Sequence, residues 1–379
     1  GLIPACLSCS VEPEACVLDL AGLCRAAAVS FVQATVTGLD TANRQLSLTG
    51  DRPPLSYDWL SLNLGAEVRA PKRPGCLPIK PLEPVLAALA ALPIGAAVRV
   101  VGSGPAAVEV SLALAARGFA VSLSGQPERA FWQGFKGALN AAGVLLDGAA
   151  QSCDVELELH CTGSWGPGWL AQSGLTLDGR GRVLTAADLS SVNDSAVFAS
   201  GDCGVIDGQQ RPPSGVWAVR AAPVLAANLQ RAVLRRPLRR WRPQPHALQL
   251  LGDGRGRAWA LWAGRQVGPS RRIWRWKQHL DQRFMAMLRP PQMASDQPMA
   301  CSGCAAKLPD APLRGALQQL AGGQLPLAED AAVAGDGWLQ SVDGFPALVA
   351  DPYLNGRLTA LHASSDLWAS GAALRHGQA

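Results

Sequence analysis

The sequence predicts an α/β protein of more than one domain, and three observations support this fold class. A strand over 97–101 runs into a glycine-rich turn, a helix and a second strand over 120–123. A buried apolar strand over 195–203 ends on a Gly-Asp pair. The chain has 379 residues, of which 48% are hydrophobic and 17% charged, so it is globular and long enough for two or more domains.

The first ninety residues predict short helices and strands in alternation. A short helix is expected over 18–28, and strands over 31–39 and 45–49 flank the hairpin turn 40–43. A third strand is expected over 56–64, and an Ala- and Leu-rich helix over 85–92 follows Pro84, a residue suited to a first turn.

A CxxC pair, Cys6 and Cys9, stands near the start of the chain. Redox chemistry is the less favoured interpretation, because a thioredoxin-type pair follows a strand and opens a helix, and Pro4 does not fit that arrangement. The ten cysteines follow no repeating frame, which favours a reducing compartment over a disulfide scaffold. We therefore expect a cytoplasmic protein.

The turn after strand 97–101 predicts a nucleotide site. It reads Gly102-Ser103-Gly104-Pro105-Ala106-Ala107-Val108-Glu109, and its glycines allow a pyrophosphate to approach the backbone at a helix N-terminus. Ala107 takes the place of a third glycine, a tolerated change. Ser124-Gly125-Gln126 follows the next strand where an NAD-selective acid would stand, so NADH, NADPH and an ordinary βα turn all stay open.

Two further strand ends carry polar signals. A strand over 154–161 precedes Thr162 and Gly163, and the strand over 195–203 ends on Gly201 and Asp202. A carboxylate at such an edge can bond a ribose or ribityl hydroxyl. A turn aspartate is an equally favoured interpretation of Asp202 from the bare pattern.

These motifs occur in order and are spaced as in two-dinucleotide flavoprotein oxidoreductases, and the stretch 215–228 adds to the likeness. Residues 1–288 resemble the type II NADH dehydrogenase-like subgroup of the pyridine nucleotide-disulfide oxidoreductases. The resemblance implies a Rossmann-like, two-dinucleotide-binding-domain flavoprotein fold with FAD and NAD(P)H. The cofactor-binding residues that it implies are Gly102, Ser103, Gly104, Ala107, Glu109, Thr162, Gly163, Gly201 and Asp202.

This sequence departs from the family's pattern in two ways. The family's first GxGxxG, which binds the FAD pyrophosphate, is not in the chain, so we expect an FAD domain that is incomplete at its N-terminus. No CxxxxC pair occurs in the nucleotide domain, so disulfide reduction is not supported.

The last eighty residues contain a thiol, a lysine and several carboxylates. Cys301-Ser302-Gly303-Cys304-Ala305-Ala306-Lys307 follows a Pro-rich linker. One CxxC without a second pair is a poor zinc site, whereas a nearby lysine can activate a thiol or hold a phosphate. Asp330, Asp343 and Asp366 lie in separate elements, a distribution that suits magnesium carrying phosphates. For any one of them, a turn or cap aspartate is the favoured alternative.

Five stretches of this region look like the start of selenide, water dikinase (selenophosphate synthetase): 301–307, 329–333, 341–345, 351–357 and 362–371. The resemblance implies the beginning of a PurM-like α+β domain with ATP and Mg2+ as ligands. It implies that Cys304 handles selenium, that Lys307 contacts ATP, and that Asp330, Asp343 and Asp366 hold magnesium. Glu329 and His362 depart from the family's usual Asp and Asn. The other half of the ATP site is expected beyond Ala379, so these residues alone should be inactive as a synthetase.

Together the two resemblances give a domain plan. It comprises FAD-binding segments over 1–92 and 166–235, an NAD(P)H domain over 93–165, a hairpin and basic helix over 236–288, a linker over 289–298 and a synthetase fragment over 299–379. The leading hypothesis is an FAD-dependent NAD(P)H oxidoreductase fused to a selenophosphate synthetase. The alternatives are an NADH:quinone-type oxidoreductase with an inactive C-terminal piece, and a non-catalytic flavoprotein-like scaffold.

The expected partners are the small molecules selenide, ATP and NAD(P)H. A net charge of +5 is mild and does not require nucleic acid. The basic segment 271–288 has apolar residues at helical spacing, and packing on its own domain is favoured over binding at a membrane surface. These apolar residues are Ile273, Trp276, Leu280, Phe284 and Met287. A homodimer is expected for the complete protein.

Overall fold

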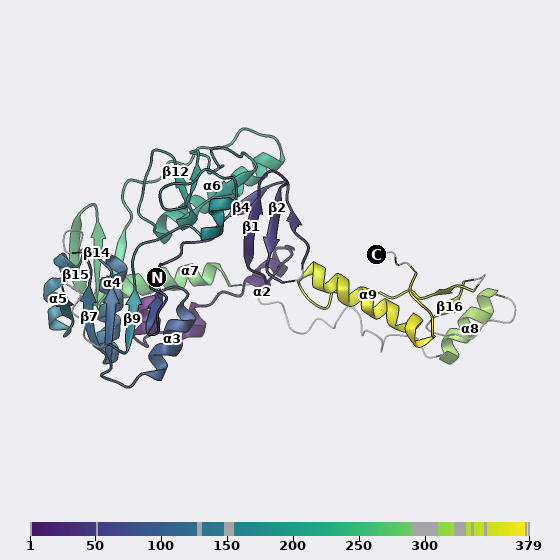
Figure 1. Ribbon diagram of the computed structural model, residues 1–379, viewed down its shortest axis with the longest axis horizontal. Coiled ribbons are helices and arrows are strands. Elements are labelled where there is room, and N and C mark those ends of the chain that lie inside the picture. The colour runs from purple at the N-terminus through teal and green to yellow at the C-terminus, as the bar shows by residue number, and fades with distance from the viewer. Residues whose placement is uncertain are drawn as a thin grey trace. The chain divides into compact units, whose positions relative to one another are not determined.

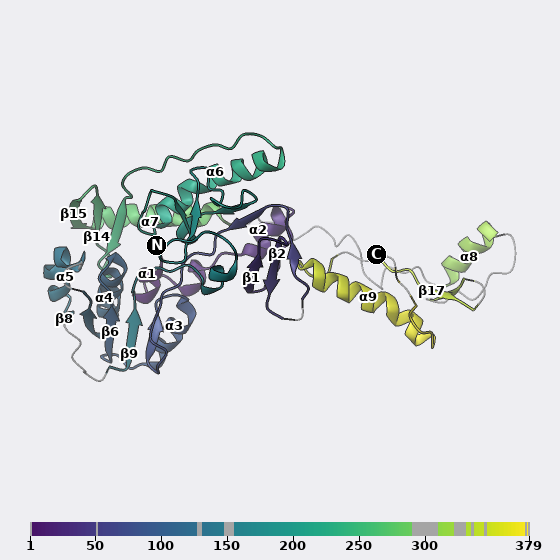
Figure 2. The same ribbon diagram turned by 45° about the horizontal axis from the view of Figure 1, so that its top comes forward.

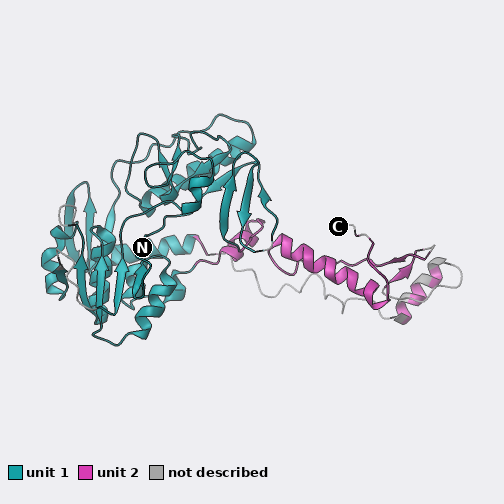
Figure 3. Ribbon diagram, viewed as in Figure 1, with its two compact units in different colours: residues 1–17, 34–287 teal, residues 18–33, 288–379 magenta. Residues whose placement is uncertain are grey.

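The computed structural model describes residues 2–50, 52–126, 131–147, 155–289, 310–321, 331–334, 337–344, 347–375 and 377 (Figure 1). Figure 3 colours the two compact units into which the chain divides. Unit 1 comprises residues 1–17 and 34–287, and unit 2 comprises residues 18–33 and 288–379.

Unit 1 contains the helices α1 (Ile3–Leu7), α3 (Leu82–Ala91), α4 (Pro105–Arg117), α5 (Lys136–Ala141), α6 (Gly215–Val233) and α7 (Arg271–Met287). Its short 3-10 helices are η1 (Pro13–Cys16), η3 (Phe131–Phe135), η4 (Gly168–Gln172) and η5 (Gly201–Cys203). Its strands are β1 (Val36–Asp40), β2 (Gln45–Leu48), β3 (Leu55–Ser56), β4 (Leu60–Leu62), β5 (Cys76–Pro78), β6 (Ala97–Val101), β7 (Ala120–Ser124), β8 (Leu145–Asp147), β9 (Leu157–His160), β10 (Val183–Thr185), β11 (Val197–Ala199), β12 (Gly204–Ile206), β13 (Gln249–Gly252), β14 (Ala258–Trp262) and β15 (Arg265–Ser270).

Unit 1 contains a five-stranded parallel sheet in the order β5-β9-β6-β7-β8, which lies at the left of Figure 2. Its alternate residues Val98, Val100 and Val121 join α3 and α4 in one hydrophobic cluster, as the two-residue period of a strand requires. Gly118 ends α4 in the left-handed region, with φ 102°. The predicted strand–turn–helix–strand unit is therefore present.

The sheet begins earlier in the chain than the expected NAD(P)H domain, because β5 pairs with β9 through Cys76 and Glu158. The expected boundary at residues 92/93 thus falls after β5, the first strand of the five-stranded sheet. The helix predicted over 85–92 is α3, which begins three residues sooner at Leu82.

The rest of unit 1 is built from smaller sheets. β1, β2 and β3 form an antiparallel sheet with the predicted hairpin turn, although β1 begins only at Val36. β4 pairs in parallel with β11, and β10 with β12. The strand expected over 195–203 is shorter, because a 3-10 turn, η5, follows Ala199.

The basic helix α7 packs on its own unit as favoured, but through a different face. Lys277 is 4% exposed, and the ring of Trp274 lies against Gly252. Most of the expected apolar stripe stays on the surface: Trp276 is 44% exposed and Met287 64%, whereas Ile273 is partly buried. Among the helices of the described residues, α7 included, none is long and apolar enough to cross a membrane.

Unit 2 contains α2 (Leu20–Ala26), α8 (Asp310–Ala321), β16 (Ala332–Val333), β17 (Leu339–Gln340) and α9 (Pro352–Ala369). Asp351 caps α9 by accepting hydrogen bonds from the N–H groups of Tyr353 and Leu354. β16 and β17 pair antiparallel. These elements are α+β in composition, and the PurM-like domain remains a proposal.

The Cys6–Cys9 redox pair considered from the sequence is not formed. Cys6, which is buried, forms a disulfide with Cys16, while Cys9 is a free, exposed thiol in the turn after α1.

Candidate nucleotide-binding site

The glycine-rich turn lies at the carboxyl end of β6, where ligands bind in open parallel sheets. Gly102 is buried, and a Cβ placed there would lie 2.8 Å from the carbonyl oxygen of Cys161. Gly104, the N-cap of α4, has nothing within 4 Å of the same position, and α4 has no side-chain cap. Gly102 therefore allows the turn to pack against the backbone just after β9. Gly104 leaves the N-terminus of α4 accessible to an anion.

The carboxyl end of β7 is tied to this turn. Gln126 donates its backbone N–H to Ser103 Oγ at 2.8 Å. A Cβ at Gly125 would lie 2.7 Å from the carbonyl oxygen of Gly102. Ser103 thus positions residues 124–126, the segment in which an NAD-selective acid is missing. Ala107 lies fully buried in the first turn of α4.

Glu109, expected to contact a cofactor, has other partners in the described chain. Its Oε1 accepts the N–H of Gly252 at 2.9 Å, and Lys277 Nζ lies 3.9 Å away. Burial raises the pKa of Glu109, while the ammonium of Lys277 and the bond from Gly252 oppose that rise. Its carboxylate therefore joins α4 to β13 and α7, a structural role that its place in the motif did not indicate.

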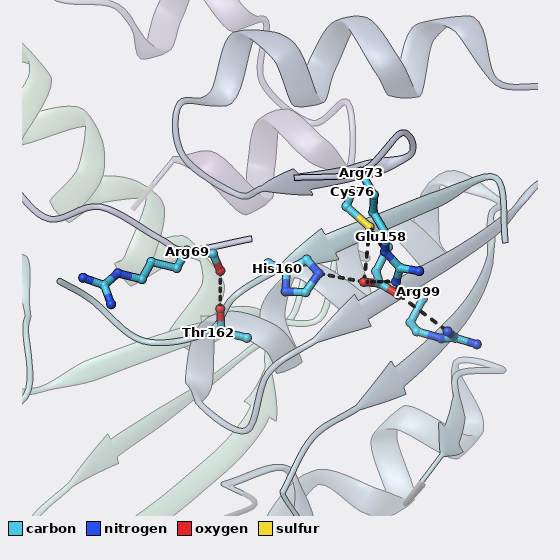
Figure 4. A network of polar contacts seen from close by, with 7 residues as sticks. All are labelled: Arg69, Arg73, Cys76, Arg99, Glu158, His160 and Thr162. Carbon is cyan, nitrogen blue, oxygen red and sulfur yellow. Dashed lines mark hydrogen bonds and ion pairs between the residues drawn. The ribbon is translucent and has the colours of Figure 1, made fainter. Parts of the chain in front are cut away.

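Thr162 and Gly163 follow β9 beside the turn. Thr162 Oγ1 donates to the carbonyl oxygen of Arg69 at 2.8 Å (Figure 4), and Gly163 has φ 74°. This bond fastens the loop before β5 to the end of β9. Both residues therefore lie at the carboxyl edge of the sheet, just after β9, the strand next to β6.

Gly201 and Asp202 lie in η5, directly after β11. A Cβ at Gly201, where φ is 70°, would lie 2.6 Å from Asn63 Oδ1. Asp202 lines a pocket with Trp217 and Ala218 of α6. Its carboxylate makes no hydrogen bond or ion pair with any residue that the structure describes. An unpartnered carboxylate at the end of a parallel strand is available to a ligand hydroxyl.

The predicted synthetase residues divide into two groups. Cys304, Lys307 and Asp330 lie outside the described residues. Asp343 and Asp366 are both described, in unit 2, and lie on one side of α9. Asp343 Oδ2 is 3.5 Å from His362 Nδ1, and Ser341 Oγ donates to Asp366 Oδ2 at 3.4 Å.

Sequence reasoning missed a polar cluster on the sheet, formed by Cys76, Glu158 and His160 with Arg73 and Arg99 (Figure 4). Burial disfavours the ionised form of Glu158, but the bonds from His160, Arg73 and Cys76 outweigh it and lower its pKa. The sequence signal for this cluster is the alternation Leu-Glu-Leu-His over 157–160, which places Glu158 and His160 on one face of a strand. Nothing local identifies Cys76 as the partner.

No protein-family model and no curated protein matches the sequence. Solved structures do match. A water-forming NADH oxidase from Lactobacillus brevis, bound to NADH, has a TM-score of 0.57 at 18% identity over 68% of this chain and 65% of that chain. A putidaredoxin reductase in covalent complex with putidaredoxin has 0.55 at 17%, over 68% and 71%. A NAD-dependent persulfide reductase from A. fulgidus has 0.55 at 15%, over 68% and 56%.

The chain thus spans 65% of the length of the oxidase and 56% of that of the persulfide reductase. At these identities the likeness establishes the fold. Over the matched 68% of its length, this chain has the mixed α/β fold of these oxidoreductase structures.

Proposed function

We propose that this chain belongs to an FAD-dependent NAD(P)H oxidoreductase and supplies its NAD(P)H site and part of its FAD site. The turn at Gly102 and Gly104 carries this proposal. It joins a central parallel strand to α4, and its second glycine leaves the backbone accessible at an uncapped helix start. The NADH named in the oxidase structure supports the choice of ligand.

The residues present fit a pyridine dinucleotide. Beside Gly104, a pyrophosphate would receive backbone N–H groups from the first turn of α4, together with the positive end of the helix dipole. Ser103 holds the end of β7 against this turn. Thr162 and Gly163 follow β9, the strand next to β6, and in this proposal they line the neighbouring side of the nucleotide site.

The FAD site is supported by Asp202. FAD, when bound, would supply the acceptor for a hydride from NAD(P)H. Asp202 would accept a hydrogen bond from a ribityl hydroxyl, and Gly201 lets this segment pass close to Asn63. The N-terminus of α6, with Ser214 as its N-cap, follows in the same pocket.

Gly104→Asp tests the nucleotide site. A carboxylate at this turn repels a pyrophosphate, so the KM for NAD(P)H should rise at least about 10-fold, the cost of roughly 1.4 kcal/mol, while the FAD content is unchanged. Gly104→Ala is the matched control, because its methyl group meets no neighbour within 4 Å. The measurement is NAD(P)H oxidation with ferricyanide and added FAD, in a chain extended at its N-terminus to complete the FAD site. Equal KM values for Gly104→Asp and wild type would remove the nucleotide from this turn.

A second function is proposed for residues 299–379, as the first part of a selenophosphate synthetase that converts selenide, ATP and water to selenophosphate, AMP and phosphate. The supporting observation is that Asp343 and Asp366 lie on one side of α9, where hard carboxylate ligands could share a magnesium ion. In this proposal Cys304 is the selenium-handling thiol and Lys307 holds ATP phosphate.

Selenide-dependent AMP release tests this second function, in a chain extended to include a complete ATP site. Cys304→Ser should abolish it, because an alcohol is a far weaker nucleophile than a thiolate, and Cys301→Ser should leave it nearly intact. Lys307→Ala should abolish ATP turnover. Full AMP release from Cys304→Ser would refute the assignment of the thiol.

A further inference from the structure

Three side chains of different chemistry converge on one face of the five-stranded sheet. Cys76 opens β5, and Glu158 and His160 lie on the neighbouring strand β9 (Figure 4). The parallel register sets Cys76 opposite Glu158, and the two-residue period of the strand puts His160 on the same face. Sγ, a carboxylate oxygen and an imidazole nitrogen all lie within 4.8 Å of one another.

The distances within the cluster are short. Glu158 Oε1 lies 2.7 Å from His160 Nε2 and 3.4 Å from Cys76 Sγ. Glu158 and His160 are only 6% and 7% exposed. Paired strands position all three residues, so the sheet itself preorganises the cluster.

We propose that Cys76, Glu158 and His160 bind a thiophilic divalent cation of the zinc type. A thiolate, an imidazole and a carboxylate are the ligands that zinc takes in proteins. On binding, the Cys76 thiol gives its proton to solvent, and His160 offers the lone pair of Nε2 in its neutral form. The metal replaces the hydrogen bonds that Glu158 Oε1 now receives from these two side chains.

One of the three proposed ligands, Cys76, borders solvent, whereas Glu158 and His160 are buried behind it. Cys76 lines an open pocket together with Arg69, Lys72 and Arg73. Three protein ligands and one open position are the pattern of a reactive zinc site rather than a closed structural one. The basic rim of the pocket would draw an anionic fourth ligand.

Two arginines decide which metal fits. Arg73 Nη2 contacts both carboxylate oxygens, at 3.0 and 3.1 Å, and Arg99 Nη1 lies 3.5 Å from Oε2. Arg73 Nε also donates to Cys76 Sγ at 3.0 Å, so Arg73 must leave both the carboxylate and the sulfur before a metal binds. The thiolate and the imidazole then favour zinc or cobalt over a hard cation such as Mg2+. The side chain of Arg73 is 61% exposed, so it can withdraw into solvent.

Cobalt substitution of the full-length protein tests the site. Wild type should bind Co2+ with a thiolate-to-cobalt charge-transfer band, and Cys76→Ser should lose part of that band and bind one Co2+ fewer per chain. Cys161→Ser, which removes a thiol one residue beyond His160, should match wild type. Removing groups that merely orient ligands costs roughly 10–100-fold in metal affinity, so His160→Gln should lose at least about 100-fold. Arg73→Gln should bind as tightly as wild type or more tightly, since it removes a competing cation.

A second measurement uses only the wild-type protein, so its result does not depend on whether a variant folds. Alkylation of Cys76 by iodoacetamide, followed by peptide mass spectrometry, should slow roughly 100-fold when free Zn2+ is about 100 times its Kd. The free, exposed Cys9 is the internal control and should keep its rate. An unchanged rate at Cys76, or an identical cobalt band and stoichiometry in Cys76→Ser, would overturn the proposal and leave a structural ion-pair cluster.

Discussion

Replacing Gly102 by alanine tests the packing that holds the nucleotide turn in place. The new Cβ would lie 2.8 Å from the carbonyl oxygen of Cys161, 3.0 Å from its Cβ and 3.1 Å from the Cβ of Ala107. Carbon contacts are optimal at roughly 3.5–4.0 Å. Since the oxygen belongs to the backbone after β9 and Ala107 to the first turn of α4, neither can move alone. The turn must shift away from β9.

Overpacking of a buried site costs typically about 1–3 kcal/mol. Fixed groups on two sides place Gly102→Ala in the upper half of this range, at about 2–3 kcal/mol. Gly104→Ala is the matched control. Its Cβ has open space, and the weaker N-cap preference for alanine is offset by about 0.4–1 kcal/mol of lost unfolded-state entropy.

The assay is urea unfolding followed by tryptophan fluorescence, with slopes compared to confirm that the same surface is exposed. The free energy of unfolding should fall by about 2–3 kcal/mol in Gly102→Ala and by less than about 0.5 kcal/mol in Gly104→Ala. Wild-type stability in Gly102→Ala, or equal losses in both variants, would refute the steric reasoning.

Three further predictions concern single carboxylates. Asp202→Asn should weaken FAD binding by about 10–100-fold, because a hydrogen bond to a charged group contributes about 1.5–3 kcal/mol; flavin fluorescence titration measures it, and an unchanged Kd would contradict it. Burial raises the pKa of Glu109, so its contribution to stability is full below the unfolded value and is lost as pH rises through the folded one. Glu109→Gln should keep the bond from Gly252 and should remove this pH dependence from urea midpoints measured between pH 4.5, the ordinary pKa of a glutamate, and neutral pH; equal pH dependence in both proteins would count against the assignment. Asp351→Ala should destabilise α9 by about 0.5–2 kcal/mol, seen as reduced helicity by circular dichroism, whereas Asp351→Asn should restore the cap, and equal effects of both would exclude capping.

The sequence predicted those parts of the fold whose signals are local. β6 has the predicted bounds, and the turn at Gly102 and Gly104 opens α4 as expected. Each of these features depends on residues close together in the chain. Strand alternation, a glycine at a tight turn and a helix start are all visible in one window of sequence.

Pairings between distant segments were not predictable in this way. Cys76 and Glu158 are opposite each other only because β9 lies between β5 and β6. Glu109 contacts Gly252 and Lys277, which come from β13 and α7. Since no local pattern encodes these neighbours, the motif predicts a cofactor contact for Glu109 but not its bond to Gly252. The inner face of α7 was misassigned for the same reason.

The position of β9 also sets an order of events during synthesis. β6 emerges from the ribosome before both of its partners. Residues 120–124 of β7 pair with one edge, and the other edge stays unpaired until residues 157–160 follow. β4 waits longer, for residues 197–199 of β11. Chains grow at roughly 5–20 residues per second, and an open apolar strand edge is a template for pairing with another chain. A chain truncated between β8 and β9 would keep β6 and β4 unpaired at these edges, so it should aggregate. A chain that continues through β12 contains both partner strands and should not.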